Sequence, residues 1–312
     1  MSDPEYFDGE RLRKALSMEE AIGALEEVFS GPLPLTPQRS VLERDGDQLL
    51  LMPSWDARAA GVKLVTVNEK NPSHGLPLIQ GVYVLFAGDT LKPIALFDAA
   101  ELTALRTAAV SALATKYLAR PDARHLVVFG AGIQGEAHIE AMSVVRNIDR
   151  VTIVSRSEEG ALRLAASPSV AAVDSSVGGP DSVRHADIVC TCTTSTTPVF
   201  DGSLLPAGCH VNAVGSHRPA EREIDSTAIT RATVFVETRQ AALAEAGDLL
   251  IPMKEGALKE VAAGDLSEVV GGRIGRSSKS EITLLKSVGV AFEDLAVALA
   301  AAKVLVEGLR PQ

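Results

Sequence analysis

The chain is poor in aromatic residues, which make up 4% of its 312 residues, and it contains three cysteines. Its helices and sheets must therefore pack through small aliphatic side chains, within a hydrophobic fraction of 46% that is ordinary for a globular protein. Cys190, Cys192 and Cys209 show neither a disulfide framework nor the spacing of a zinc site. We expect them to be small buried residues in a reducing compartment.

An excess of positive charge and long apolar runs are also missing. The net charge of −10 excludes the basic footprint that non-specific nucleic-acid binding requires. The N-terminus is polar and acidic, unlike a signal peptide, and the apolar stretch at 291–308 is too short and too charged for a bilayer. No two histidines have metal-ligand spacing, so no metal site is predicted. We expect a cytoplasmic protein that binds neither nucleic acid nor membranes.

The first hundred residues predict a mixed α+β module. A helical pattern covers residues 18–30. Strand-like runs follow at residues 47–55, 59–69, 79–88 and 93–102. Turn signals at Asp45-Gly46 and Gly88-Asp89 favour antiparallel neighbours. A long helix is predicted over residues 101–121, and Pro121 ends it.

From Arg124 onward, short apolar strands alternate with helices, which predicts a parallel sheet. The tail, residues 279–309, reads as a long helix broken near Ser287, Val288 and Gly289. The predicted fold class is α/β, with a Rossmann-type doubly wound parallel sheet over 119–289. A mixed α+β substrate-binding and dimerisation domain covers 1–118 and is completed by the C-terminal helix within 290–312.

A glycine pattern, Gly130-x-Gly132-x-x-Gly135, directly follows the predicted strand HLVVF and opens a helix. The first glycine permits a tight turn, the second lets the backbone approach a pyrophosphate, and the third allows close helix–strand packing. The alternative is a tight turn that binds nothing. The position between a strand and a helix, with a second strand some twenty residues later, favours a dinucleotide site.

The end of that second strand, Ser155-Arg156-Ser157, bears on the choice of cofactor. An acidic residue there would bind the ribose 2′-hydroxyl of NAD, whereas a guanidinium between two hydroxyls suits a 2′-phosphate. We therefore favour NADP(H). NAD(H) stays possible, because Glu158 could serve it and Arg156 could be a solvated loop residue.

Three cations stand out by context: Arg39 after LTPQ, Lys63 inside GVKLVTV, and Arg106 on the helix that leads into the Rossmann half. On pattern alone, each is more often a solvated surface charge.

Five stretches resemble the ornithine cyclodeaminase/mu-crystallin family and occur in the family's order. They are GVKLVTVNEKNPSHGLP, LRTAAVSALATKYLARP, VVFGAGIQGEAH, NAVGSHRPAEREID and GRIGRSSKSEITLLKSVG. The resemblance runs from about residue 39 to residue 300. It implies a two-part α/β protein, usually a homodimer, with a nicotinamide dinucleotide on the Rossmann half and an amino or imino acid between the halves.

The resemblance also implies roles for individual residues. Arg39 and Arg106 would hold the substrate carboxylate, with Lys63 close to the carboxylate or the reacting nitrogen. The cofactor would be met by Ile133 and Gln134 at the pyrophosphate, Ser155, Arg156 and Ser157 at the adenosine ribose, and Thr193 and Val214 at the nicotinamide. Ser287 and Val288 would close the site, Ser287 toward the cofactor and Val288 toward the substrate.

These residue types suit an α-imino acid. Two guanidiniums can fix its carboxylate by bidentate hydrogen bonds, and the C=N carbon accepts hydride more readily once the nitrogen is protonated. Lys63, on an apolar strand and crowded by arginines, should have a depressed pKa and could donate that proton.

His217 stands where cyclodeaminases of this family have Asp, and no acid follows until Glu221. The departure disfavours ammonia elimination and favours simple reduction. His217 could relay a proton, or it could cap a loop or hydrogen-bond Glu221 or Glu223.

The main hypothesis is an NAD(P)H-dependent ketimine reductase that acts on C=N bonds. It would convert the cyclic imino acids Δ1-pyrroline-2-carboxylate and Δ1-piperideine-2-carboxylate to L-proline and L-pipecolate. Three alternatives stay open. They are an ornithine cyclodeaminase-type lyase with bound NAD, an amino-acid dehydrogenase, and a mu-crystallin-like protein that binds a small carboxylated ligand.

Overall fold

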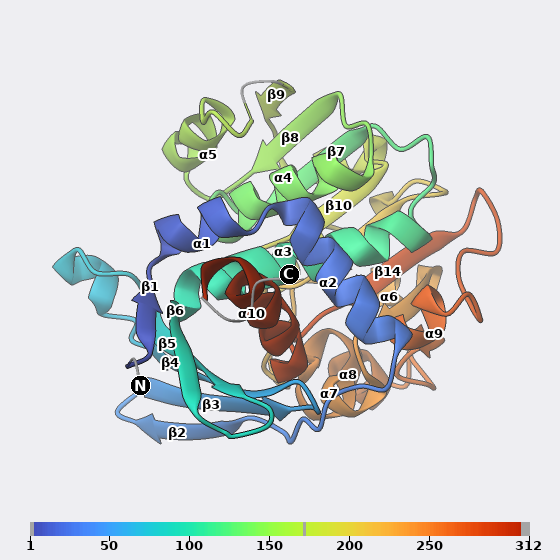
Figure 1. Ribbon diagram of the computed structural model, residues 1–312. Helices are drawn as coiled ribbons and strands as arrows, with labels where there is room; N and C mark the ends of the chain where they lie inside the picture. The colour runs from blue at the N-terminus through green and yellow to red at the C-terminus, as the bar shows by residue number, and fades with distance from the viewer. Residues whose placement is uncertain (1–2, 171–172, 307–312) are drawn as a thin grey trace. The chain divides into compact units, whose positions relative to one another are not determined.

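Figure 1 shows a computed structural model that describes residues 3–170 and 173–306. The chain divides into two compact units, Met1–Arg106 with Val290–Gln312, and Thr107–Gly289. The sequence prediction placed the first boundary after residue 118, whereas this division falls inside helix α3 (Ala99–Leu118). Residues 1–2 and 307–312 of the predicted first domain lie outside the described residues. The two units are described separately below.

The first unit, which we call unit 1, is built on a six-stranded sheet in the order β1-β6-β5-β4-β3-β2. Its strands are β1 (Glu5–Phe7), β2 (Ser40–Arg44), β3 (Asp47–Trp55), β4 (Ala59–Val67), β5 (Ile79–Ala87) and β6 (Pro93–Asp98). Its helices are α1 (Gly9–Ala15), α2 (Met18–Ser30), the 3-10 turn η1 (Asn71–His74) and α10 (Ala291–Leu305), with the start of α3. The pairs from β2 to β6 are antiparallel, as the turn signals predicted. The pair β1–β6 is parallel.

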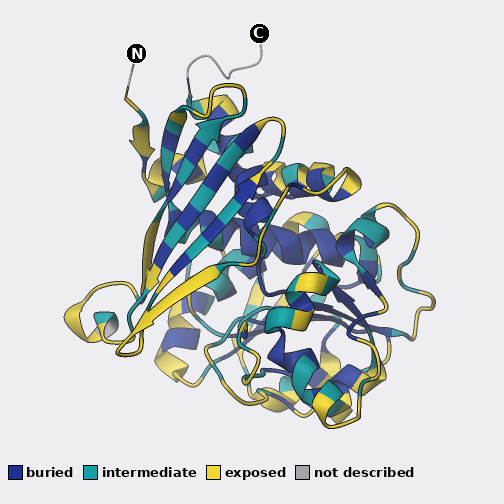
Figure 2. Cartoon of the chain, turned by 90° about the horizontal axis from the view of Figure 1, so that it is seen from below, coloured by how far each residue is buried: buried dark blue, intermediate teal, exposed yellow. Residues whose placement is uncertain are grey.

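The two faces of the unit 1 sheet differ in burial, which alternates along β3, β4 and β5 (Figure 2). The buried face carries a row of four residues in register, Met52, Lys63, Tyr83 and Phe97. Helix α10 supplies this face with an apolar cover. The opposite face leaves apolar side chains exposed, among them Leu42, Leu49 and Trp55.

The second unit, unit 2, contains an eight-stranded sheet whose strands are all parallel, in the order β13-β12-β14-β11-β10-β7-β8-β9. The strands are β7 (His125–Phe129), β8 (Arg150–Val154), β9 (Asp174–Val177), β10 (Ile188–Thr191), β11 (His210–Ala213), β12 (Ala232–Val236), β13 (Gly264–Asp265) and β14 (Ile282–Lys286). The connecting helices are α4 (Ile133–Val145), α5 (Glu158–Ala165), η2 (Pro180–His185), η3 (Gly202–Leu204), α6 (Ser226–Arg231), α7 (Arg239–Glu245), α8 (Gly247–Lys254) and α9 (Leu266–Val270).

The strand order confirms the predicted Rossmann-type sheet. β7 lies between β8, its successor along one half, and β10, which begins the other half. The chain therefore reverses its direction of winding at β7–β10. Ligands of open parallel sheets bind at such a switch point, beyond the carboxyl ends of the strands.

One predicted element is wrong. Residues 282–286 were read as part of a long helix, but they form β14, between β11 and β12 in the middle of the sheet. All five residues of β14 are buried. A short apolar run that is buried on every side has no period that separates a strand from a helix.

Among residues 3–170 and 173–306, none of the helices combines the length and the apolar composition that a membrane span requires.

Candidate active site

The glycine turn of unit 2 follows β7 at the switch point. Gly130 has a φ of 108°, and a Cβ atom there would lie 2.4 Å from the carbonyl oxygen of Cys192. A Cβ atom on Gly135 would lie 2.1 Å from the carbonyl oxygen of Gly130. The backbone of unit 2 itself therefore requires these two glycines.

Gly132 differs from them, because a Cβ atom there would meet nothing within 4 Å. It is the N-cap of α4, makes no side-chain cap, and is exposed together with Ile133. The packing of unit 2 does not explain a glycine at this position, whereas a pyrophosphate that approaches the helix amides would. The turn therefore fits a dinucleotide, with Gln134 half-buried one residue further along.

The residues that follow β8 cap a helix and also expose a guanidinium to solvent. Ser157 caps α5, because its hydroxyl oxygen accepts the N–H of Gly160 at 3.1 Å, while Ser155 accepts the N–H of Ser157 at 3.3 Å. The sequence pattern did not reveal this cap. Arg156 is exposed and pairs with no residue among those that the structure describes. Its guanidinium is available to an anion at this edge of the sheet.

Glu223 joins the carboxyl ends of β10 and β11. One oxygen of its buried carboxylate accepts the N–H and the hydroxyl of Thr193, at 2.8 and 2.6 Å. The other oxygen accepts the N–H of Gly215 at 2.7 Å and the hydroxyl of Thr191 at 2.9 Å. Burial raises the pKa of Glu223. The loops that carry Thr193 and Val214 are therefore positioned by one side chain that the sequence analysis did not select.

Asp248 and Lys286 support Glu223 from behind. Asp248 accepts the N–H groups of Glu223 and of the next residue, at 2.7 and 2.8 Å, and pairs with the Lys286 ammonium at 2.9 Å. Lys286 also donates to the carbonyls of Ala213 and Ser216, at 3.2 and 2.6 Å. We call Glu223, Asp248 and Lys286 the backbone-bonded cluster.

Glu237, at the end of β12, holds the segment that follows β14. Its carboxylate accepts the hydroxyl of Ser287, the N–H of Val288 at 2.9 Å and the N–H of Gly289 at 3.0 Å. Ser287 and Val288 are both buried. The sequence predicted that these two residues lie at a break in a long helix. In the structure they lie between strand β14 and helix α10.

His217 is exposed on the loop after β11. The two carboxylates considered as its partners have other hydrogen bonds. Glu223 accepts from β10 and β11, and Glu221 accepts from Arg218 at 3.2 Å. A role of His217 in proton transfer stays a prediction.

In unit 1, Lys63 lies on β4, an interior strand, with 2% of its surface exposed. Its ammonium lies 2.9 and 3.0 Å from the two carboxylate oxygens of Asp294 and 3.2 Å from the hydroxyl of Thr103. The reading of Lys63 as a solvated surface charge is therefore wrong. Within residues 3–170 and 173–306, its hydrogen-bond partners are side chains.

Arg106 is also buried, and it pairs with two acidic residues of α10. Its Nε atom lies 3.1 Å from Asp294 Oδ1, and its NH1 atom lies 3.1 Å from Glu293 Oε2. Arg39 is half-buried, and its NH1 atom lies 3.9 Å from the sulfur of Met52, the register neighbour of Lys63. We call Lys63, Arg106, Glu293 and Asp294 the side-chain cluster.

Burial lowers the pKa of Lys63 to about 8, against the attraction of Asp294, and the charges of Arg106 and Arg39 lower it further. The predicted depression of this pKa is confirmed in direction. Tyr83, opposite Lys63 on β5, has its pKa raised by burial and by the charge of Asp294.

The sequence analysis did not select Glu293 or Asp294. A signal was present, because two adjacent acids interrupt the apolar helix AFEDLAVALAAA. Acidic residues are almost never fully buried unless they are paired. The same signal, one charge in an apolar strand, marks Lys286 at the end of ITLLK.

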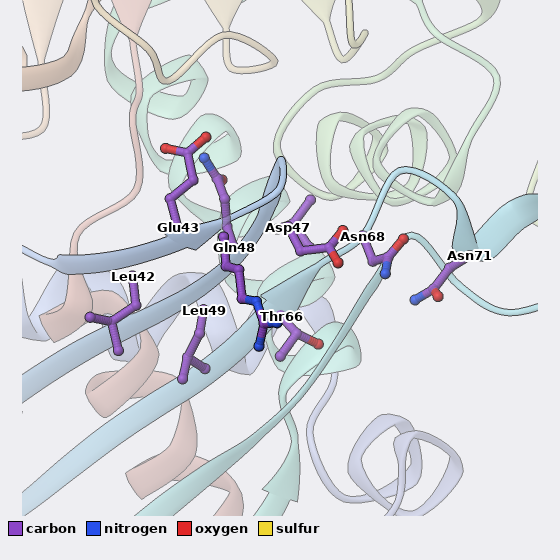
Figure 3. A pocket seen from close by; sticks show the side chains of 10 residues that line it. Leu42, Glu43, Asp47, Gln48, Leu49, Thr66, Asn68 and Asn71 are labelled. Atoms are coloured by element: carbon purple, nitrogen blue, oxygen red, sulfur yellow. The ribbon is translucent and has the colours of Figure 1, made fainter.

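A surface hollow of about 390 Å³ lies on unit 1, where β2, β3 and the end of β4 meet (Figure 3). Glu43 and Asp47 line it beside Arg44, together with the apolar Leu42 and Leu49. None of its residues was predicted to bind substrate or cofactor. Two carboxylates suit a carboxylated substrate poorly, so we do not place the active site there.

The sequence matches the model of the ornithine cyclodeaminase/mu-crystallin family over residues 8–308. The chain belongs to this family. A relative from Colwellia psychrerythraea, named delta(1)-pyrroline-2-carboxylate reductase, is 38% identical over 307 residues, which cover 94% of this chain and 97% of that protein.

Solved structures agree with the family assignment. Delta(1)-pyrroline-2-carboxylate reductase of Thermococcus litoralis, in complex with NADH and L-proline, matches with a TM-score of 0.91 and 32% identity over 96% of each chain. An archaeal alanine dehydrogenase dimer with bound NAD matches with a TM-score of 0.90 and 29% identity, over 96% of this chain and 95% of that one.

Proposed function

We propose that this protein is an NAD(P)H-dependent reductase of cyclic imino acids. The observation that carries the proposal is the buried side-chain cluster, in which Lys63 and Arg106 share Asp294, in a chain whose relatives are named delta(1)-pyrroline-2-carboxylate reductase. The reaction converts Δ1-pyrroline-2-carboxylate to L-proline, or the six-membered homologue to L-pipecolate. The bound reduced nicotinamide supplies a hydride to the C=N carbon.

The residues of unit 1 bind and protonate the substrate. Arg39 and Arg106 hold its carboxylate with charge-assisted hydrogen bonds, which orients the C=N bond. Lys63 donates a proton to the imine nitrogen, which then bears the hydrogen of the secondary amine product. Arg106 already places two donors among carboxylates, so a substrate carboxylate would compete with Glu293 for the same guanidinium.

The residues of unit 2 bind the cofactor. The open space at Gly132 and the amides of Ile133 and Gln134 receive the pyrophosphate, while Thr193 and Val214 border the nicotinamide. Ser287 and Val288 close the site, and His217 serves as a second group able to move protons.

Arg156 favours NADPH over NADH, because its exposed guanidinium can bind a 2′-phosphate. Replacing Arg156 with Ala should weaken NADPH binding by about 10- to 100-fold and leave NADH binding nearly unchanged. Fluorescence titration with each cofactor measures both values. Equal losses for the two cofactors would contradict the assignment.

The exposed apolar face of the unit 1 sheet supports a homodimer. Light scattering of the purified protein measures the mass, and a Leu49→Lys variant should shift it toward the monomer. A wild-type monomer would overturn this part of the proposal.

The main experiment follows NADPH and NADH absorbance with each of the two cyclic imines, with L-ornithine tested in parallel for ammonia release. Oxidation of the cofactor by an imine without ammonia release is the expected result. Ammonia from ornithine would instead indicate the lyase, and binding of the acids without turnover would indicate a binding protein.

A further inference from the structure

We propose that Asp294 is a positioning residue for Lys63. It keeps the buried ammonium of Lys63 charged and oriented, so that Lys63 can donate a proton to the imine nitrogen of the substrate. The inference deepens the proposed function and rests on it for the identity of the proton acceptor. The geometry of α10 and β4 within unit 1 carries the inference independently.

The position of Asp294 favours this role. Both of its carboxylate oxygens lie within 3.0 Å of the Lys63 ammonium, and one of them is shared with Arg106 Nε at 3.1 Å. Asp294 itself is 0% exposed. Its neighbour Phe292 packs edge-on against Phe29 of α2, with ring centroids 5.2 Å apart, which fixes the first turn of α10.

The charges around Lys63 make Asp294 necessary. The segment before β2 brings Arg39, α3 brings Arg106, β5 brings the neutral phenol of Tyr83, and α10 brings Asp294. Apart from Asp294, these neighbours are cations or neutral groups. A buried amine beside two guanidiniums loses its proton readily, because desolvation and like charge both disfavour the ammonium.

Glu293 does not replace Asp294 in this role. Its carboxylate accepts from the guanidinium of Arg106, at 3.1 Å, and from the N–H of Val290, at 3.2 Å. The two adjacent acids of α10 therefore have different roles. Asp294 balances the proton donor, and Glu293 balances the guanidinium that would receive the substrate carboxylate.

The proton transfer then proceeds in a balanced way. The Nζ–H bond of Lys63 breaks as an N–H bond forms on the imine nitrogen, and the hydride adds to the carbon. Lys63 is left as a neutral amine beside the Asp294 carboxylate. The negative charge of Asp294 favours uptake of a proton from solvent, which returns the ammonium for the next turnover.

The test compares Asp294→Asn with Glu293→Gln, a matched change of one neighbouring acid on the same helix turn. In Asp294→Asn, the basic limb of the kcat/KM profile should move at least one pH unit lower. At pH values above the limb, kcat/KM should therefore fall at least tenfold more, relative to the wild type, than it does at low pH. In Glu293→Gln, the limb should stay in place while KM falls, because the substrate carboxylate no longer competes with Glu293 for Arg106. A loss in Asp294→Asn that is equal at every pH would overturn the proposal.

A second variant, Asp294→Glu, keeps the charge and changes the length of the side chain. It should retain the wild-type limb even where kcat falls. A limb that lies one pH unit or more below that of the wild type would show that charge is not the cause, and it would overturn the proposal even if Asp294→Asn fails to fold.

A readout without catalysis separates this inference from the proposed function. Because the Lys63 ammonium is costly to bury, the free energy of unfolding should rise with pH once Lys63 deprotonates in the folded state. The rise should begin at a lower pH in Asp294→Asn than in the wild type. If the rise shifts but no cyclic imine is reduced, the role of Asp294 stands and the proposed function fails. If imines are reduced but neither the limb nor the rise moves, the role of Asp294 fails.

Discussion

The two units bury charged residues of the same types in different ways. In the backbone-bonded cluster of unit 2, Lys286 donates to two carbonyls and Asp248 accepts two backbone N–H groups. In the side-chain cluster of unit 1, the ammonium of Lys63 donates to the side chains of Asp294 and Thr103. Backbone partners cannot move without unfolding, whereas side-chain partners can be exchanged for those of a ligand. We therefore assign a structural role to the first cluster and chemistry to the second.

The largest expected effect separates activity from stability. Lys63→Met should lower kcat/KM by about 100- to 10,000-fold, since it removes the general acid. Its melting temperature should stay close to that of the wild type, because the variant removes an ammonium that is costly to bury and leaves Asp294 paired with Arg106. Steady-state kinetics and calorimetry check the two results. Retained turnover would show that Lys63 is not the proton donor.

The reverse pattern is expected for unit 2. Asp248→Asn leaves the Lys286 ammonium buried without its counter-ion, and should lower the free energy of unfolding by about 3–5 kcal/mol. Denaturant titration measures the loss. Glu159→Gln, which breaks the exposed pair with Arg163, is the control and should change stability by less than about 1 kcal/mol. Equal effects in the two variants would contradict the structural role of Asp248.

The stability of unit 1 should depend on pH through Lys63. Its pKa falls from an ordinary value of 10.5 to about 8 in the folded state, a difference of about 2.5 units. Between these values the unfolded chain binds the extra proton, so the free energy of unfolding rises with pH, by on the order of 3 kcal/mol in total. Below about pH 8 both states are protonated, and the cost of the buried ammonium is present in full. Denaturant titrations from pH 7 to 10.5 should show this rise in the wild type, relative to Lys63→Met.

A smaller and local effect is expected at Glu237. Neutralising this carboxylate in Glu237→Gln weakens its bonds to Ser287, Val288 and Gly289, and should cost about 1–3 kcal/mol. Amide hydrogen exchange at Val288 and Gly289 should become faster than in Glu281→Gln, a control at the opposite end of β14. Unchanged exchange at these two amides would show that Glu237 does not hold the segment.

Local patterns in the chain were informative wherever one face of an element is buried or a turn needs glycine. The strands over 47–55 and 125–129, the glycine turn and a helix that begins at Ile133 were all predicted from such patterns. Strand β14 was not, because a run that is buried on every side shows no period. The predicted cations Lys63 and Arg106 came from a family resemblance, since pattern alone favoured a solvated surface for both.

The sequence by itself determined the alternation of strands and helices before β14 and the dinucleotide turn, because these depend on neighbours in the chain, while the family resemblance selected the cations. Only the tertiary structure decided which charges are buried together. Asp294 lies 231 residues after Lys63, and Glu223 accepts hydrogen bonds from residues 8 to 32 positions away. The energy of a buried charge depends on its partners in space and on the loss of water, and neither is written in the residues beside it.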